Sequence, residues 1–165
     1  GYVGDPTKPV FAIRPGATGD ITLQDGQRSN NSIVWYQDNA GPYHPTPLVY
    51  DDYYFTLLDR GFYTVHDAHT GEELYFTEQQ VLNQEVRRRV ARSAGGFTSS
   101  PWTYNDKIFV LSEDGDTYVI DPTNDFNVVA TNSLEEVAMS SPAMAQGSLF
   151  IRTRSHVWRL SNQAR

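Results

Sequence analysis

Two histidines three residues apart, His66 and His69, come nearest to a metal site by residue type and spacing. They lie at the end of an apolar, β-branched run and in the turn that follows it, and no third ligand stands in register with them. Protein sites for zinc use three or four side-chain ligands. The sequence therefore predicts two exposed histidines at a turn and no metal site.

The acidic run Glu113–Asp116 could suggest a calcium loop. It lacks the alternating ligands and the distal glutamate of an EF-hand. Its Asp-Gly pair is instead typical of a tight turn between two strands, because such turns need a left-handed backbone. We predict a hairpin turn here.

Serine, arginine and cysteine give no catalytic constellation either. Ser99–Ser100 and Ser140–Ser141 lack the glycines of a nucleophile elbow. Four arginines within residues 87–92 could bind an anionic partner, but they also suit the solvated end of a helix. The chain has no cysteine, which excludes disulfides and thiolate chemistry. The sequence predicts no catalytic residue, no metal and no cofactor.

The stretch Ser99–Asp121 contains three short strand-like runs and recurs along the chain. At an offset of 54 residues, identical residues align without a gap, and seven of these pairs mark the repeat. They pair Pro47 with Pro101, Tyr50 with Tyr104, Asp52 with Asp106, Phe55 with Phe109, Gly61 with Gly115, Val65 with Val119, and Asp67 with Asp121. At an offset of 41, Ser99–Pro101 recurs as Ser140–Pro142. This is a repeat protein.

Four strands per about 40–45 residues is the signature of a propeller blade. The predicted fold is all-β: a partial β-propeller, over residues 1–165, of about three to four antiparallel blades. We expect the end of one blade at 10–36, whole blades at 44–78 and 98–131, and an incomplete blade at 139–161. The chain is expected to be the C-terminal part of a larger propeller.

The two repeat offsets differ by 13 residues, and an insertion at 77–96 accounts for the excess. Leu82, Val86 and Val90 recur every four residues, which indicates one face of a helix. Thr77 and Gln80 have the spacing of a capping box. We predict a short helix over 77–92 that lies on the propeller surface.

The text from Val65 to Tyr75 resembles the tryptophan-docking motif of PQQ-type (quinoprotein-like) β-propellers. Asp67, Thr70 and Gly71 match that motif, Tyr75 stands where the family has tryptophan, and Trp35 keeps the indole in the leading segment. In the second repeat Asp121 matches, whereas the Thr, Gly and Trp positions differ. The resemblance implies structural docking between neighbouring blades, with Trp35 and Tyr75 buried.

Such propellers include quinone-dependent dehydrogenases, outer-membrane assembly scaffolds and other exported proteins. The dehydrogenases need a quinone, a Ca²⁺ ion and a carboxylate base, and many carry a vicinal disulfide that this chain cannot form. The sequence favours a non-enzymatic scaffold or binding module of an exported, periplasmic protein. A fragment of a PQQ-dependent dehydrogenase is the alternative. An adaptor of the WD-repeat type would show Trp-Asp pairs, and none occurs.

The net charge and the hydropathy of the sequence limit the classes of partner that the chain is expected to bind. The net charge of −7 disfavours nucleic acid. No apolar run approaches the roughly 20 residues of a membrane-spanning helix, and no signal peptide opens the sequence. Open blade edges at both ends would expose unpaired backbone and apolar faces. We therefore expect a protein partner or self-association, with 148–160 and 10–36 near the contact.

Overall fold

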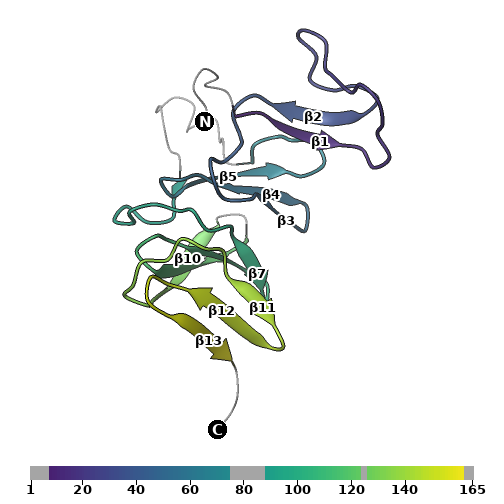
Figure 1. Cartoon of the computed structure of the whole chain (residues 1–165). Coiled ribbons are helices and arrows are strands. Elements are labelled where there is room, and N and C mark those ends of the chain that lie inside the picture. Colours follow the sequence, from purple (N-terminus) through teal and green to yellow (C-terminus); the bar gives the residue numbers. More distant parts are fainter. Residues whose placement is uncertain (1–7, 75–87, 124–125, 162–165) are drawn as a thin grey trace.

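The computed structural model describes residues 8–74, 88–123 and 126–161, and these residues form thirteen strands and no helix. The strands make four antiparallel sheets that follow one another along the chain (Figure 1). Within each sheet consecutive strands are hydrogen-bonded neighbours, as in the blades of a propeller. The predicted all-β propeller fold is confirmed.

Two of the sheets are four-stranded blades. The first whole blade contains β3 (Leu48–Tyr50), β4 (Tyr53–Leu57), β5 (Phe62–Asp67) and β6 (Arg88–Arg89). The second whole blade contains β7 (Trp102–Tyr104), β8 (Lys107–Leu111), β9 (Asp116–Asp121) and β10 (Asn127–Ser133). Asn105 and Asp106 join β7 to β8 with φ angles of 49° and 55°, the backbone that a two-residue hairpin turn requires.

Smaller sheets stand at the two ends of the row. The leading sheet contains β1 (Val10–Ile13) and β2 (Ile33–Gln37). The last blade contains β11 (Ala143–Ala145), β12 (Ser148–Arg152) and β13 (Val157–Ser161). Within the described residues, the outer edge of β13 has no partner strand.

The helix predicted over 77–92 is wrong at its carboxyl end, where Arg88–Arg89 forms strand β6 on the outer edge of β5. Glu73 forms a bridge with His66 on that same edge. An exposed strand edge carries backbone groups that need partners, so extended pairing prevails here over helix propensity. The insertion therefore interrupts the fourth strand of the blade. The rest of the predicted helix lies outside the described residues.

The main core lies between the two whole blades. Phe55 and Leu57 on β4 face Ile108 and Val110 on β8, and all four are 0% exposed. Phe126 stacks on Phe55, with 6.1 Å between ring centroids. Burying a side chain of this size stabilises a fold by about 1.5–3 kcal/mol. A smaller cluster joins the second whole blade to the last blade.

Each connection between blades lies against hairpin turns of both blades. Between the two whole blades, the Glu113 N–H donates to the Gly96 carbonyl at 2.8 Å. Between the second whole blade and the last blade, the Arg154 N–H donates to the Val137 carbonyl, also at 2.8 Å. Both residues of the second bond lie 41 positions after those of the first. The repeat spacing of the sequence thus holds in three dimensions.

Glu136 fastens the second of these connections to the turn between β12 and β13. Its carboxylate accepts hydrogen bonds from the Thr153 hydroxyl at 2.6 Å and the Ser155 N–H at 2.6 Å, and it lies 2.9 Å from His156 Nδ1. These hydrogen bonds, that from Thr153 foremost, lower the pKa of Glu136 from 4.5 to about 2. The ionised carboxylate therefore stabilises the junction.

We expect Glu136→Gln to remove an acid-sensitive part of the stability. Because the pKa of Glu136 is lower in the folded chain than in the unfolded chain, its contribution is complete above pH 4.5 and is lost as the pH falls towards about 2. Thermal unfolding at several pH values should show a shallower acid decline in this variant. Glu135→Gln, at the exposed neighbour, is the control. Identical profiles for Glu136→Gln and the unmodified chain would contradict the expectation.

Candidate functional site

Trp35 on β2 packs against the turn that follows β5. Its side chain is only 7% exposed, and its Nε1 donates a hydrogen bond to the Ala68 carbonyl at 2.9 Å. A Cβ atom on Gly71, where φ is +74°, would lie 2.7 Å from the indole ring. Only glycine leaves room for the indole there. Trp35 thus joins the leading sheet to the first whole blade.

Asp67 orders the same turn from within. Its carboxylate accepts hydrogen bonds from the backbone N–H groups of Thr70, at 2.7 Å, and His69, at 2.9 Å. These bonds, that from Thr70 first, lower the pKa of Asp67 below its ordinary value. Asp121 lies 3.7 Å from the Lys107 ammonium, and Tyr75 is outside the described residues. It stays a prediction that the motif residues dock neighbouring blades onto one another. These residues are Trp35, Asp67, Thr70, Gly71, Tyr75 and Asp121.

The histidine prediction is half wrong. His69 is exposed and lies 3.0 Å from Asp52, as a turn residue can. His66 is only 3% exposed, because its side chain lies on the face of β5 that is turned towards the leading sheet. Burial lowers its pKa below the ordinary value. Among the described residues no group of three potential ligands could hold a metal ion.

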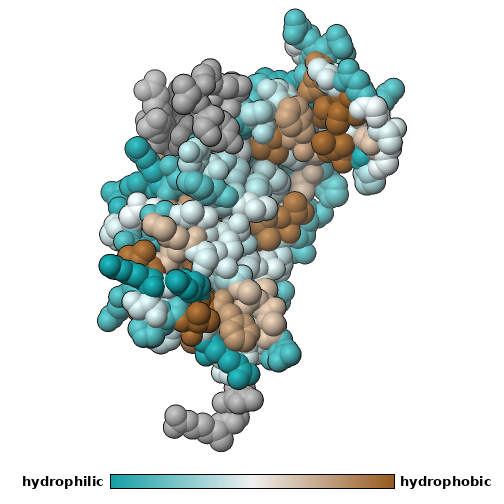
Figure 2. All heavy atoms as spheres, viewed as in Figure 1, coloured by the Kyte–Doolittle hydropathy of each residue, from teal (hydrophilic) through white to brown (hydrophobic). Residues whose placement is uncertain are grey.

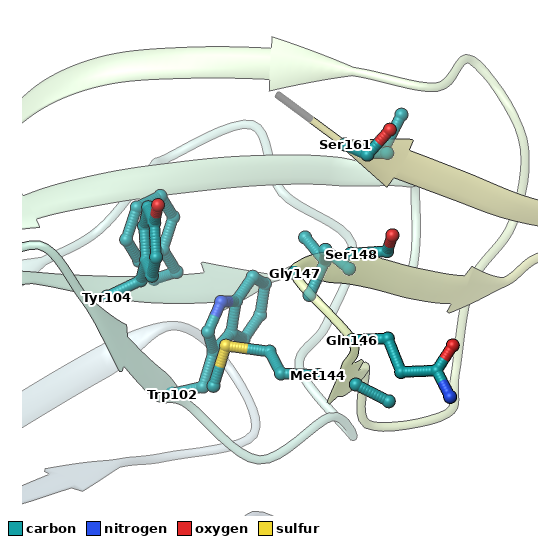
Figure 3. Close-up of a pocket in the computed structure, with 11 residues that line it drawn as sticks. Trp102, Tyr104, Met144, Gln146, Gly147, Ser148 and Ser161 are labelled. Carbon is teal, nitrogen blue, oxygen red and sulfur yellow. The ribbon is translucent and has the colours of Figure 1, made fainter. Parts of the chain in front are cut away.

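An open apolar pocket of about 480 Å³ lies between the second whole blade and the last blade. Figure 3 shows aromatic side chains of β7 on one side and the β11–β12 hairpin on the other. The lining residues are Trp102, Tyr104, Phe109, Met144, Ala145, Gln146, Gly147, Ser148, Leu149, Leu160 and Ser161. None of them is an aspartate, glutamate, histidine, lysine or arginine, and Tyr104 is the titratable side chain of the lining.

Strand register explains why apolar side chains meet there. Met144 pairs with Leu149, and Leu149 pairs with Leu160. Directly paired residues share one face of a sheet, so all three side chains are turned towards the second whole blade. On the opposite wall, Trp102 stacks on Phe109 with 5.5 Å between ring centroids. Two repeats therefore build the pocket jointly.

Three large apolar side chains at this pocket remain open to solvent. Tyr104 is 60% exposed, Met144 is 54% exposed and Leu160 is 43% exposed. Exposed apolar clusters with a polar rim are typical of binding sites. Sequence analysis missed the pocket because its residues come from two repeats that no motif connects. Apolar residues beside the two hairpin turns were the only signal.

A second hollow lies over the leading sheet, where residues 20–28 cross its outer face. Arg28 forms an ion pair with Asp38 at 2.5 Å, and its guanidinium lies 5.4 Å from the centroid of the Tyr36 ring. Figure 2 shows apolar side chains gathered at this end of the molecule. Phe11 and Ile13 stay 44% and 53% exposed. The crossing segment therefore covers the apolar face of the leading sheet only in part.

Comparison with known proteins gives a fold but no sequence family. No family profile matches the chain, and no curated protein matches it in sequence. The crystal structure of BamB from Moraxella catarrhalis is similar over 79% of this chain and 41% of its own, with 16% identity and a TM-score of 0.51. A europium-containing methanol dehydrogenase (19% identity, TM-score 0.43) matches over 61% of this chain and 19% of its own. The computationally designed Ika8 protein (13% identity, TM-score 0.43) matches over 69% and 32%.

In the part of the chain that the structure describes, no helix could cross a membrane. The sheet order, the repeated junctions and the likeness to BamB agree on one architecture. This chain has a β-propeller-type fold like that of BamB, and it spans 41% of the BamB chain.

Proposed function

We propose that this chain is a non-enzymatic propeller scaffold that binds a protein partner at the pocket between the second whole blade and the last blade. The observation that carries the proposal is the exposure of Tyr104, Met144 and Leu160 around a cavity of about 480 Å³. An apolar side chain of a partner would cover these groups, with a gain of about 25 cal/mol for each Å² removed from water. The absence of ionisable acid and base groups other than Tyr104 from the lining favours binding over catalysis.

The resemblance to PQQ-type propellers supports an exported, periplasmic location for this scaffold. The partner can be a second copy of the chain. Within the described residues the outer edge of β13 has no partner strand, so a strand of another copy could pair with it. Light scattering at micromolar concentration separates the cases. A monomer of 18.6 kDa leaves a different protein as the partner.

We expect an extended heptapeptide with a central phenylalanine to bind at this pocket and to change the fluorescence of Trp102. Met144→Glu should weaken that binding at least tenfold, because an unpaired carboxylate in an apolar site costs more than the roughly 1.4 kcal/mol that a tenfold change represents. Val49→Glu is the matched control, since Val49 is 63% exposed on β3 and lies outside the pocket.

Equal weakening by both variants, or no effect of Met144→Glu, would contradict the proposed binding site. The dehydrogenase alternative has its own assay: PQQ and Ca²⁺ are added, and reduction of a dye by alcohols or sugars is followed. Quinone absorbance with dye reduction would replace the scaffold proposal by an enzymatic one.

A further inference from the structure

The face that each blade turns towards the next follows one pattern in the two whole blades. The second strand contributes a phenylalanine and, two residues later, a leucine, and the third strand places a valine opposite the phenylalanine. These residues are Phe55, Leu57 and Val65 in the first whole blade and Phe109, Leu111 and Val119 in the second. The leucine and the valine are buried in both blades.

The last blade keeps the phenylalanine and replaces both aliphatic residues by arginine. Phe150 pairs with Arg159, which occupies the valine position, and Arg152 occupies the leucine position. The turn between β12 and β13 is one residue shorter than the turn between β8 and β9. Strand pairing, and not a fixed spacing in the sequence, therefore shows this equivalence.

Five residues of the last blade form what we call the arginine face: Ser148, Phe150, Arg152, Val157 and Arg159. Alternation along the strands places them opposite the side chains that contact the second whole blade. Val157 is 69% exposed, and both arginines are exposed. Figure 1 shows this sheet at the end of the row, with no described segment beyond it.

Each arginine donates a hydrogen bond, Arg159 across the sheet to β12 and Arg152 to the residue that follows it. Arg159 Nε donates a hydrogen bond to the Ser148 hydroxyl at 3.0 Å, and Arg152 Nη1 donates to the Thr153 carbonyl. Each stands two residues along from the partner of the other, a diagonal that spans about 7–8 Å in an antiparallel pair. The arrangement presents two ordered guanidinium groups beside Phe150 and Val157.

The distribution of charged residues along the sequence changes where the last blade begins. Residues 137–165 contain four of the 13 basic residues and none of the 20 acidic residues. A merely solvated face usually mixes both signs of charge. The last blade instead presents cations alone, in a chain whose net charge is −7.

We propose that the arginine face docks an acidic protein surface, with carboxylates opposite Arg152 and Arg159 around an apolar contact to Phe150 and Val157. Guanidinium groups bind carboxylates through paired, charge-assisted hydrogen bonds. A purely apolar partner would bury two unpaired cations, which is strongly unfavourable. Apart from Ser148, which belongs to both, this face and the lining of the apolar pocket lie on opposite sides of the last blade.

The test uses a hexapeptide with two glutamates on each side of a Leu-Phe pair, and a matched peptide with glutamine in place of glutamate. We expect the glutamate peptide to shift backbone amide NMR signals of β12 and β13, and the glutamine peptide to bind at least tenfold more weakly. Arg152→Gln with Arg159→Gln should weaken the glutamate peptide at least tenfold. Arg14→Gln, at an exposed arginine outside the last blade, should leave the affinity unchanged.

The variant Arg152→Leu with Arg159→Val restores the residues of the whole blades. This variant should also lose its affinity for the glutamate peptide. If its apolar face makes it aggregate, the variant with Arg152→Gln and Arg159→Gln still provides the test. Equal binding of both peptides, undiminished affinity in the glutamine variant, or shifts confined to other strands would overturn the proposal. So would no binding at all, which would make the arginine face a solvated end, or preferential binding of a short DNA duplex.

Discussion

Trp35→Ala is expected to lower the free energy of unfolding by about 3–5 kcal/mol, the usual cost of truncating a buried aromatic side chain. The indole is 7% exposed and fills the space over Gly71, so its removal leaves a cavity between the leading sheet and the first whole blade. The Ala68 carbonyl also loses its donor. Urea or thermal unfolding measures the effect.

Trp35→Phe separates packing from hydrogen bonding. It keeps a flat apolar ring and loses the bond to Ala68, whose net worth is about 0.5–1.5 kcal/mol. We expect the free energy of unfolding of Trp35→Phe to lie between that of Trp35→Ala and that of the unmodified chain. An unchanged melting temperature for Trp35→Ala would show that the docking set proposed from the sequence does not hold the sheets together.

Gly115→Ala is the second large effect. Gly115 has a φ of +89°, and a Cβ atom there would lie 2.2 Å from the Glu136 carbonyl oxygen. That oxygen belongs to the backbone of the connection to the last blade, so no side-chain rotation relieves the clash. The cost should exceed the roughly 1–3 kcal/mol of a strained backbone alone.

Gly147→Ala is its matched control. Gly147 also has a positive φ, +66°, but nothing lies within 4 Å of a Cβ atom there. The difference between the two melting temperatures therefore measures the close approach of the connection to Gly115. An equal fall in melting temperature in both variants would mean that the positive φ angle alone explains why position 115 requires glycine.

The repeats and turns were predictable because their causes are local. Asn105 and Asp106 specify a hairpin by their own backbone preference, and the alternating Ile108 and Val110 specify a half-buried strand. Because the repeats align at fixed offsets, the strands predicted in one blade also predict the strands of the next blade. The fold class follows from these features without any long-range information.

The errors arise where a distant partner decides. Arg88–Arg89 suits the end of a helix by charge, yet the open edge of β5 draws it into a strand. His66 borders a turn in the sequence, but its side chain lies beneath the leading sheet. The same limit hides the apolar pocket, because Tyr104 and Met144 belong to different repeats. The arginine face was hidden by the shorter turn before β13, which shifts the alignment by one residue.

The connections that bind the turns of two consecutive blades also determine how the molecule can open. Among the described residues each blade packs against its immediate neighbours alone, so stability is a series of nearest-neighbour couplings, as in other linear repeat arrays. The two whole blades have a neighbour on both sides, whereas the leading sheet and the last blade have one each among the described residues. The last blade can detach by breaking the junction at Arg154 and Glu136 together with the smaller apolar cluster, while the core around Phe55 stays closed. Unfolding would then start at the ends and advance blade by blade, with the pairing of the two whole blades the last to be lost.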